Sequence, residues 1–229
     1  YQRLRQFTAD ASHELRGPLA ALAGTASVAV REAPELSEQT RSRFEDISIV
    51  AGEMRRLIDD LLILARSDQS MERELFIVEI DAIMVSIQLR YADAAIEKGL
   101  RLQFTGPTGQ EIYGNPEQIE RIVANLVENA IRYTRAGGAI AVSWTLDPHR
   151  VEIVVRDTGI GIAQRNLKRI FDRFWRVDLA RQADRGTGLG LPIAQALARR
   201  HGGDVTVVSE EAEGSTFTIS LPRRPPSLK

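Results

Sequence analysis

The sequence predicts a multi-domain chain in which an all-α helical hairpin precedes an α/β two-layer sandwich. Two observations lead to this fold class. Over the first 66 residues, apolar side chains recur at alternating spacings of four and three, as on one face of a helix. Further along the chain, apolar and polar residues alternate in short segments, as in half-buried strands. The length of 229 residues allows one or two domains.

The predicted hairpin consists of two helices with heptad-like apolar seams. The first seam comprises Leu15, Leu19, Leu22, Ala26 and Ala29. The second comprises Ile47, Ala51, Met54, Ile58, Leu61 and Ala65. A polar, proline-containing stretch at 32–39 separates the two runs. Two helices cannot cover such seams by themselves, so a homodimer that forms a four-helix bundle is the simplest completion. Packing of the hairpin on the rest of its own chain is the alternative.

The second domain is predicted from four alternating strands and three helical patterns. The apolar strand residues are Leu100, Leu102 and Phe104; Ile140, Val142 and Trp144; Val151, Ile153 and Val155; and Phe217, Ile219 and Leu221. The helical patterns lie near 81–97, 116–134 and 188–200. Such a mixture predicts a sheet with one face covered by helices. We therefore expect a hairpin at 1–67, a linker at 68–74, the sandwich domain at 75–222 and a disordered tail at 223–229.

Composition excludes several classes of function. Thirty Lys and Arg against 31 Asp and Glu leave a net charge of −1, so no basic field indicates nucleic acid as a partner. The absence of cysteine excludes disulfides, thiolate metal sites and a cysteine nucleophile. The three histidines are too scattered for a zinc site. The longest apolar helical run is shorter than the roughly 20 residues that cross a membrane. Because the chain begins with Tyr1 inside a helical pattern, we expect it to be part of a longer protein, which leaves a membrane anchor upstream open.

Four polar side chains form a stripe on the helix predicted at 116–134. Asn125 and Asn129 are four residues apart and share one helix face, and Arg132 and Tyr133 continue it. Amide oxygens suit Mg²⁺, which retains most of its water and binds through substrate phosphates. The alternative is that the two asparagines are ordinary solvated groups.

Two glycine-containing segments follow this helix. In Asp157-Thr158-Gly159-Ile160-Gly161-Ile162, Gly159 and Gly161 allow close approach of the backbone to a ligand, and Asp157 can accept a hydrogen bond from an amino group. The alternative is a simple turn. Further on, residues 163–190 carry seven Lys or Arg and three Asp, a local charge of +4.

The basic segment ends in glycines that lead into a predicted helix. These residues are Gly186, Thr187, Gly188, Leu189 and Gly190. Glycines at a helix N-terminus with basic residues ahead predict an anion site for phosphates and a mobile lid at about 163–190. The spacing matches neither a P-loop nor a dinucleotide-binding fingerprint. An ordinary charged surface loop is the alternative.

Four segments in this order resemble the boxes of the histidine-kinase ATP-binding domain: NLVENAIRYT, DTGIGI, IFDRFWR and GTGLGL. That domain belongs to the class shared with gyrase, ninety-kilodalton chaperones and mismatch-repair ATPases. The resemblance implies ATP and Mg²⁺ as cofactors. It implies that Asn129, with Asn125, holds Mg²⁺ and that Asp157 contacts the adenine amino group.

The same resemblance assigns roles to the remaining residues of the boxes. Arg132 and Tyr133 line the nucleotide, with Gly159 and Gly161 close to it, and Arg176 is positioned for the γ-phosphate. The lid end and phosphate loop are formed by Gly186, Thr187, Gly188, Leu189 and Gly190.

The hairpin carries a histidine in FTADASHELRGPL. His13 and Glu14 fall just off the apolar seam, so the imidazole can meet a second domain, and one of its nitrogens is free to act as a nucleophile. Gly17 and Pro18 predict a bend beside it. The segment resembles the phosphoacceptor box of sensor histidine kinases. This resemblance implies that His13 accepts the γ-phosphoryl group of ATP, with Glu14 as acid/base partner, and passes it to an aspartate of a response-regulator receiver domain.

One residue departs from the family pattern. The family usually has Thr or Asn four residues after the phosphorylated histidine, where it is thought to position the water that dephosphorylates the regulator; this chain has Gly17. We expect kinase activity with weak phosphatase activity, unless the backbone or a neighbour substitutes. The rival functions are a non-kinase ATPase of the same nucleotide fold and a degenerate dimeric scaffold. The resemblance also implies the cytoplasmic portion of an inner-membrane sensor, with contact to the membrane only through segments outside this chain.

Overall fold

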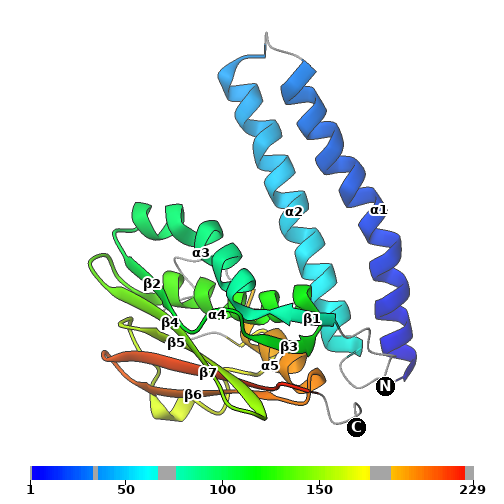
Figure 1. The fold of residues 1–229 in the computed structure, drawn as a ribbon. Coiled ribbons are helices and arrows are strands. Elements are labelled where there is room, and N and C mark those ends of the chain that lie inside the picture. The colour runs from blue at the N-terminus through cyan, green and yellow to red at the C-terminus, as the bar shows by residue number, and fades with distance from the viewer. Residues whose placement is uncertain (1, 33–35, 67–75, 176–186, 225–229) are drawn as a thin grey trace. The chain divides into compact units, whose positions relative to one another are not determined.

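The computed structural model describes residues 2–32, 36–66, 76–175 and 187–224. The chain divides into two compact units, Tyr1–Gln69 and Ser70–Lys229. The first unit is all-α, and the second combines helices with a sheet (Figure 1). The predicted fold class is therefore confirmed. The linker expected at 68–74 lies outside the described residues.

The first unit is an antiparallel hairpin of α1 (Gln2–Glu32) and α2 (Glu38–Arg66). Small residues allow the two helices to pack closely. Ala26 and Ala51 are accordingly only 3% and 2% exposed. Ser37 caps the start of α2, where its Oγ accepts a hydrogen bond from the Thr40 backbone N–H at 3.3 Å. At the predicted bend, α1 continues through Pro18 as one helix.

Four of the larger seam residues of the hairpin are only partly covered within one chain. Leu15 and Leu22 are each 50% exposed, and Ile47 and Met54 are 42% and 49% exposed. Each pair is spaced by one heptad, so these side chains lie in two rows along the hairpin. A pair of helices contacts each other along one narrow line, which leaves the outer half of these apolar side chains in water.

The second unit contains a five-stranded sheet in the order β2-β4-β5-β7-β6. Its strands are β2 (Arg101–Thr105), β4 (Ala139–Leu146), β5 (Arg150–Asp157), β7 (Gly214–Pro222) and β6 (Asp204–Glu210). Strand β2 runs parallel to β4, and the other neighbours are antiparallel. A separate antiparallel pair joins β1 (Phe76–Glu79) to β3 (Glu111–Gly114).

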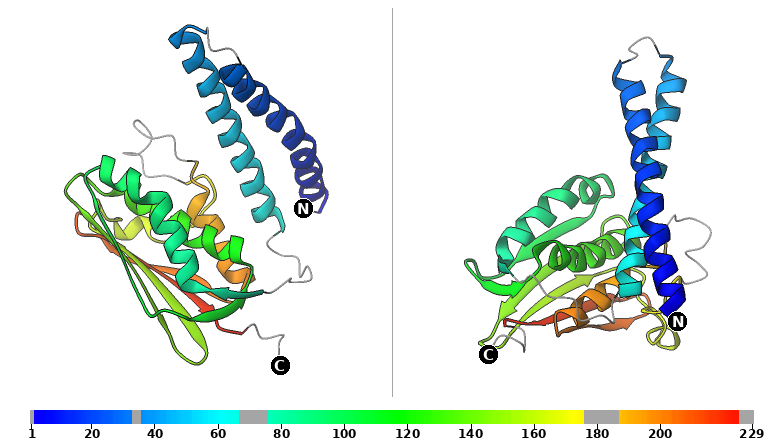
Figure 2. Two further views of the ribbon diagram at one scale, coloured as in Figure 1. Left: turned by 45° about the horizontal axis from the view of Figure 1, so that its top comes forward. Right: turned by 90° about the vertical axis from the view of Figure 1, so that its right-hand side faces the viewer.

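Three helices cover one face of the five-stranded sheet (Figures 1 and 2). They are α3 (Ile80–Glu97), α4 (Pro116–Tyr133) and α5 (Gly190–Arg200). The alternation predicted in the sequence becomes a core between the two layers. Val151, Ile153 and Val155 on β5 are fully buried, whereas Glu152 and Arg156 on the same strand are exposed. The sheet therefore presents its apolar face to the helices and a polar face to solvent.

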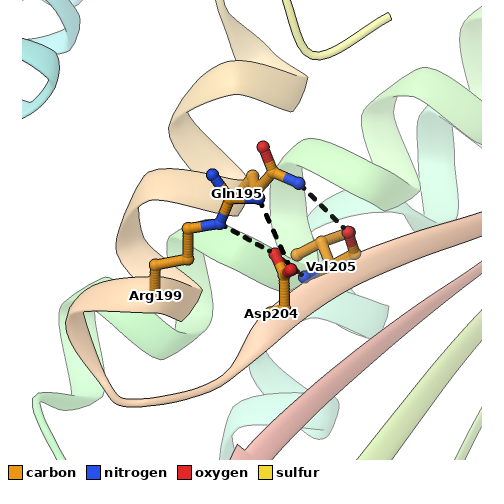
Figure 3. A network of polar contacts seen from close by, with 4 residues as sticks. All are labelled: Gln195, Arg199, Asp204 and Val205. Carbon is orange, nitrogen blue, oxygen red and sulfur yellow. Dashed lines mark hydrogen bonds and ion pairs between the residues drawn. The ribbon is translucent and has the colours of Figure 1, made fainter. Parts of the chain in front are cut away.

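The turn from α5 into β6 is fixed by polar contacts (Figure 3). His201 caps the C-terminal end of α5, and the next residue, Gly202, adopts a φ of +81°, a conformation that glycine adopts readily where a helix ends. Arg199 Nε lies 3.2 Å from Asp204 Oδ1, and Gln195 Nε2 donates to the Val205 carbonyl at 3.4 Å. These contacts hold α5 against the edge strand, and so fix the direction in which its N-terminus points.

Two further findings concern membranes and the tail. Among the residues that the structure describes, no helix combines the length and the apolar character that crossing a membrane would require. At the other end of the chain, Arg223 belongs to the segment expected to be disordered, yet its N–H donates to His149 O at 2.8 Å and its carbonyl accepts from Tyr113 N at 2.9 Å. Residues 225–229 lie outside the described part.

Candidate functional site

The predicted polar stripe lies on α4. Asn115 caps this helix by accepting a hydrogen bond from Gln118 N at 3.0 Å, and Pro116 occupies its first turn. The apolar face of α4 packs on the sheet through Ile119, Ile122, Val123, Leu126, Val127 and Ala130. The four polar residues of the stripe are half-buried beside this face. They thus occupy the boundary between core and solvent, where a ligand can reach them.

The two asparagines of the stripe differ in their contacts. Asn125 Nδ2 donates to the backbone carbonyl of Gly190 at 3.1 Å, and this bond joins α4 to the first residue of α5. Asn129 makes no side-chain hydrogen bond to any residue that the structure describes, so its amide is available to a ligand or to water. Arg132 Nη2 lies 3.1 Å from Glu128 Oε1 one turn earlier.

Asp157 ends β5 and is buried, with 6% of its surface exposed. Its Oδ1 accepts hydrogen bonds from Gly159 N at 2.8 Å and Ser215 N at 3.3 Å. Oδ2 receives no hydrogen bond from the described residues. Burial raises the pKa of the Asp157 carboxyl, and the two backbone N–H groups oppose that rise. The site therefore holds one carboxylate oxygen fixed by the chain and a second one available as an acceptor.

The segment after Asp157 packs closely against two other parts of the unit. Ile160 N donates to Tyr133 O at 3.2 Å, which ties the segment to the end of α4. A Cβ on Gly159 would lie 2.6 Å from that same carbonyl, so this approach requires glycine. Gly161 has a φ of +65°, and a Cβ there would lie 1.9 Å from Glu210 O. Both glycines are thus needed for backbone packing in the structure itself.

The second glycine segment is described only in part. Gly188 has a φ of +70°, and its carbonyl accepts a hydrogen bond from Phe174 N at 3.1 Å. Thr187 is exposed, and its Oγ1 accepts from Leu189 N at 3.3 Å, while the Leu189 side chain is fully buried. Gly190 then begins α5. The structure does not describe residues 176–186 of the predicted lid. Arg176 and Gly186 therefore lie outside the described residues.

Two features of the site were not predicted from the sequence. Ser215 belongs to β7, and the pairing of Asp157 with Ser215 in the register of β5 and β7 brings its N–H to the carboxylate. Lys98 follows α3, and its Nζ donates to the carbonyls of Ile131 and Arg132 at the end of α4. Neither lies in a recognisable motif, and both contacts depend on tertiary structure.

His13, Glu14 and Gly17 lie in α1, in the first unit. The side chains of His13 and Glu14 lie outside the described part. Gly17 is exposed, and a Cβ built on it would meet nothing within 4 Å. Among the described residues, no group of three or more His, Cys, Asp and Glu has the arrangement of a metal site. The amide oxygen of Asn129, in the second unit, is of the kind that suits Mg²⁺, which binds through few protein groups and through the phosphates of a ligand.

Comparison with known families gives two matches along the chain. Residues 3–70 match the His Kinase A (phospho-acceptor) domain. Residues 114–225 match the histidine kinase-, DNA gyrase B- and HSP90-like ATPase family. The two matches correspond to the hairpin and to most of the sheet unit, from the end of β3 onward.

Curated relatives match nearly the whole chain. The sensor histidine kinase RppB of Synechocystis is 38% identical over 226 residues, which are 97% of this chain and 50% of the relative. The sensor protein SrrB of Staphylococcus aureus is 34% identical over 233 residues, which are 97% of this chain and 38% of the relative. The chain thus spans about half the length of the first relative and less of the second.

Solved structures have the same architecture. A crystal structure of full-length ShkA in complex with AMPPNP superposes with a TM-score of 0.79 at 29% identity, covering 95% of this chain and 45% of that one. The mycobacterial sensor histidine kinase MprB gives a TM-score of 0.58 at 27% identity, covering 66% of this chain and 99% of that one.

Proposed function

Because the chain belongs to the histidine kinase family, we propose that it transfers the γ-phosphoryl group of ATP to its own His13. The observation that carries this proposal is the convergence of three separate segments in the second unit. Asn125 bonds to Gly190, Tyr133 bonds to Ile160, and Asp157 presents a buried carboxylate in the same glycine segment. One helix thereby brings together a polar stripe, an acceptor for an amino group and a glycine-lined helix start.

The residues of the second unit fit the parts of a nucleotide. Oδ2 of Asp157 accepts a hydrogen bond from the adenine amino group, and burial strengthens that bond by excluding competing water. Tyr133 and Arg132 line the nucleotide, with Gly159 and Gly161 holding the segment close to it. The phosphate loop comprises Gly186, Thr187, Gly188, Leu189 and Gly190, and Arg176 stabilises the γ-phosphate.

The chain's amide groups fit a hydrated cation. The amide oxygen of Asn129, assisted by Asn125, holds Mg²⁺ together with the phosphates, in keeping with the free amide of Asn129. When bound, Mg²⁺ neutralises charge on the phosphate oxygens during transfer.

In the transfer step, one nitrogen of the His13 ring forms a bond to the γ-phosphorus while the bond to the bridging oxygen of ADP breaks. ADP leaves with the electron pair of that bond, and Glu14 polarises the other ring nitrogen or takes its proton. Phosphoryl transfer needs alignment and positive charge more than covalent help, and the fixed segments of the second unit supply the alignment. We further propose that His13 passes the phosphoryl group to an aspartate of a response-regulator receiver domain.

We also propose how the chain assembles and where it acts. The half-exposed seam residues support a homodimer in which two hairpins form a four-helix bundle. The chain acts as the cytoplasmic portion of a membrane sensor, in keeping with relatives named as sensor proteins of which it spans about half or less.

The first test is autophosphorylation with γ-labelled ATP and Mg²⁺, comparing the wild type with His13→Ala. We expect an acid-labile label, as phosphohistidine gives, that the substitution abolishes while nucleotide binding is retained. An undiminished label in the variant would contradict His13 as acceptor. No label in the wild type despite nucleotide binding would leave a gated ATPase or a scaffold, and a hydrolysis assay separates those two.

Gly17 leads to a second prediction, about hydrolysis of the phosphorylated regulator. Without a side chain to position water, the wild type is expected to dephosphorylate a phosphorylated regulator slowly. Gly17→Thr should accelerate this decay, by about tenfold if one water-positioning hydrogen bond is gained. The substitution has room, because a Cβ at Gly17 meets nothing within 4 Å. Rapid decay with wild-type protein would show that another group performs this role.

A further inference from the structure

The last turn of α4 has an unusual partner for its carbonyl groups. The final carbonyls of a helix have no partner within the helix. At the end of α4, the carbonyls of Ile131 and Arg132 both accept hydrogen bonds from Nζ of Lys98, each at 2.7 Å. An ammonium group at this end also interacts favourably with the negative end of the helix dipole. Lys98 therefore acts as a cap supplied by another element.

The carbonyl that follows these two connects the same turn to the glycine segment. Tyr133 O accepts a hydrogen bond from Ile160 N at 3.2 Å. Ile160 lies three residues after Asp157, the proposed acceptor for adenine. A shift in the last turn of α4 would thus move Tyr133 O and, with it, the segment that follows Asp157.

Lys98 is well placed to fix this turn. It is half-buried and follows directly on α3, where its backbone N–H bonds to Ala94 O. The next residue, Gly99, accepts a hydrogen bond from Gly137 N at 2.9 Å, so the backbone beside Lys98 is tied to the loop that follows α4. In the described part of the chain, Lys98 forms no ion pair with a carboxylate, and its ammonium group donates hydrogen bonds to the two carbonyls alone. The ammonium is dedicated to the helix end.

We propose that Lys98 is a positioning residue for the nucleotide: it holds the last turn of α4, and through Tyr133 and Ile160 the glycine segment, in the conformation that binds ATP. This inference rests on the proposed function for the identity of the ligand. Lys98 itself touches neither nucleotide nor metal. Lys98 acts by fixing the positions of the last turn of α4 and of the glycine segment after Asp157, which lie on either side of the bound base.

The experiment uses the whole chain and compares Lys98→Met with Lys98→Arg. Methionine keeps most of the length of the side chain but removes the donors, whereas arginine keeps the charge and can bond the same carbonyls. The matched control is Arg90→Met, because Arg90 in α3 also pairs with α4, at Glu120 near the beginning of that helix. Binding of a fluorescent ADP analogue, amide hydrogen exchange without nucleotide and the kinetics of autophosphorylation are measured for each.

We expect Lys98→Met to raise the Kd for ADP about tenfold, since two charge-assisted hydrogen bonds are lost. The KM for ATP should rise in parallel with little change in kcat, whereas a loss of folded protein alone would lower the apparent kcat and leave KM unchanged. Amide exchange should accelerate at Ile160 and leave the strands of the sheet unaffected. Lys98→Arg should restore most of the affinity, and Arg90→Met should leave it near the wild-type value.

Two results would overturn the proposal: unchanged affinity and exchange in Lys98→Met, or equal losses in Lys98→Met and Arg90→Met. Failure of the proposed function is distinguishable from both. If the wild type bound no adenine nucleotide, the exchange measurement at Ile160 would still decide whether Lys98 holds the turn.

Discussion

Asp157 is the residue at which the structure and the proposed chemistry are most directly coupled. Its carboxylate is buried, two backbone N–H groups hold Oδ1, and burial raises its pKa. Keeping a carboxylate in such a place costs stability, because burial penalises the charged form. A purely structural position would be served as well by an uncharged acceptor, so the charge is expected to serve a ligand.

Asp157→Asn separates these two effects. The amide oxygen can still accept from Gly159 and Ser215, but an amide nitrogen at the other position cannot accept a bond from adenine. We expect the Kd for ADP to rise at least about tenfold, as loss of a hydrogen bond to a charged group does. Isothermal titration of the variant with ADP measures this, and an unchanged Kd would remove Asp157 from the site.

The same variant gives a pH dependence with a definite sign. Because the folded-state pKa lies above the ordinary value of 3.8, the folded protein binds more protons than the unfolded chain between the two values. The stability of the wild type should therefore fall as pH rises from 3.8 through the raised pKa, whereas Asn does not titrate. Urea unfolding of both proteins should show the variant gaining relative to the wild type toward neutral pH, and a constant difference would contradict this.

Site residues differ in how far the sequence alone could predict them. The spacing of Asn125 and Asn129 predicts a shared helix face, and the structure has both on α4. The spacing could not show that Asn125 is bonded to Gly190, because that contact depends on the packing of two helices 65 residues apart. Ser215 and Lys98 were not predicted for the same reason. Ser215 contributes a backbone N–H that the pairing of β5 with β7 brings to Asp157, and Lys98 contributes a flexible side chain from a residue distant in the sequence.

At the scale of elements, long periodic segments were predicted well and short strands were not. The three predicted helices lie within a few residues of α3, α4 and α5, because each has a sustained apolar face. Strands β1 and β3 have four residues each, too few to show an alternation. Strand β6 lies at the sheet edge and exposes 77% of Val208, so its apolar residues do not follow a period of two.

One contact between elements leads to a stability prediction. The glycine segment packs on the turn between β6 and β7, where Ala212 N donates to Ile160 O at 2.8 Å and Gly161 approaches Glu210 O. Gly161→Ala should cost about 3 kcal/mol or more, from the positive φ and from a Cβ that has no space. Gly109→Ala is the control, since Gly109 has a φ of +66° and open space around it. It should cost only about 1 kcal/mol.

Chemical denaturation of both glycine variants measures these differences. Similar losses in the two would show that the backbone strain alone matters and that the turn can move away from the added methyl group.

At the scale of the whole molecule, the exposed seam of the hairpin predicts self-association. Leu22→Lys places a charge where the second hairpin would bury an apolar side chain, so the dissociation constant of the dimer should rise about a hundredfold or more. Sedimentation equilibrium measures it. Val208→Lys likewise replaces an exposed apolar side chain by lysine, but on the outer strand of the sheet, and should leave association unchanged. A wild-type chain that remained monomeric at high concentration would contradict the four-helix bundle.

The parallel pairing of β2 with β4 has a consequence for how the second unit folds. Strands β4 and β5 are joined by a short turn and can pair as soon as both are made, whereas β2 must await a partner that follows β3 and α4. Loop closure over that distance is slow, so we expect the edge with β2 to be completed late and to open first. That edge begins beside Lys98. A partly folded chain that lacks only the pairing of β2 with β4 would therefore have a hydrophobic core but would not yet bind a nucleotide.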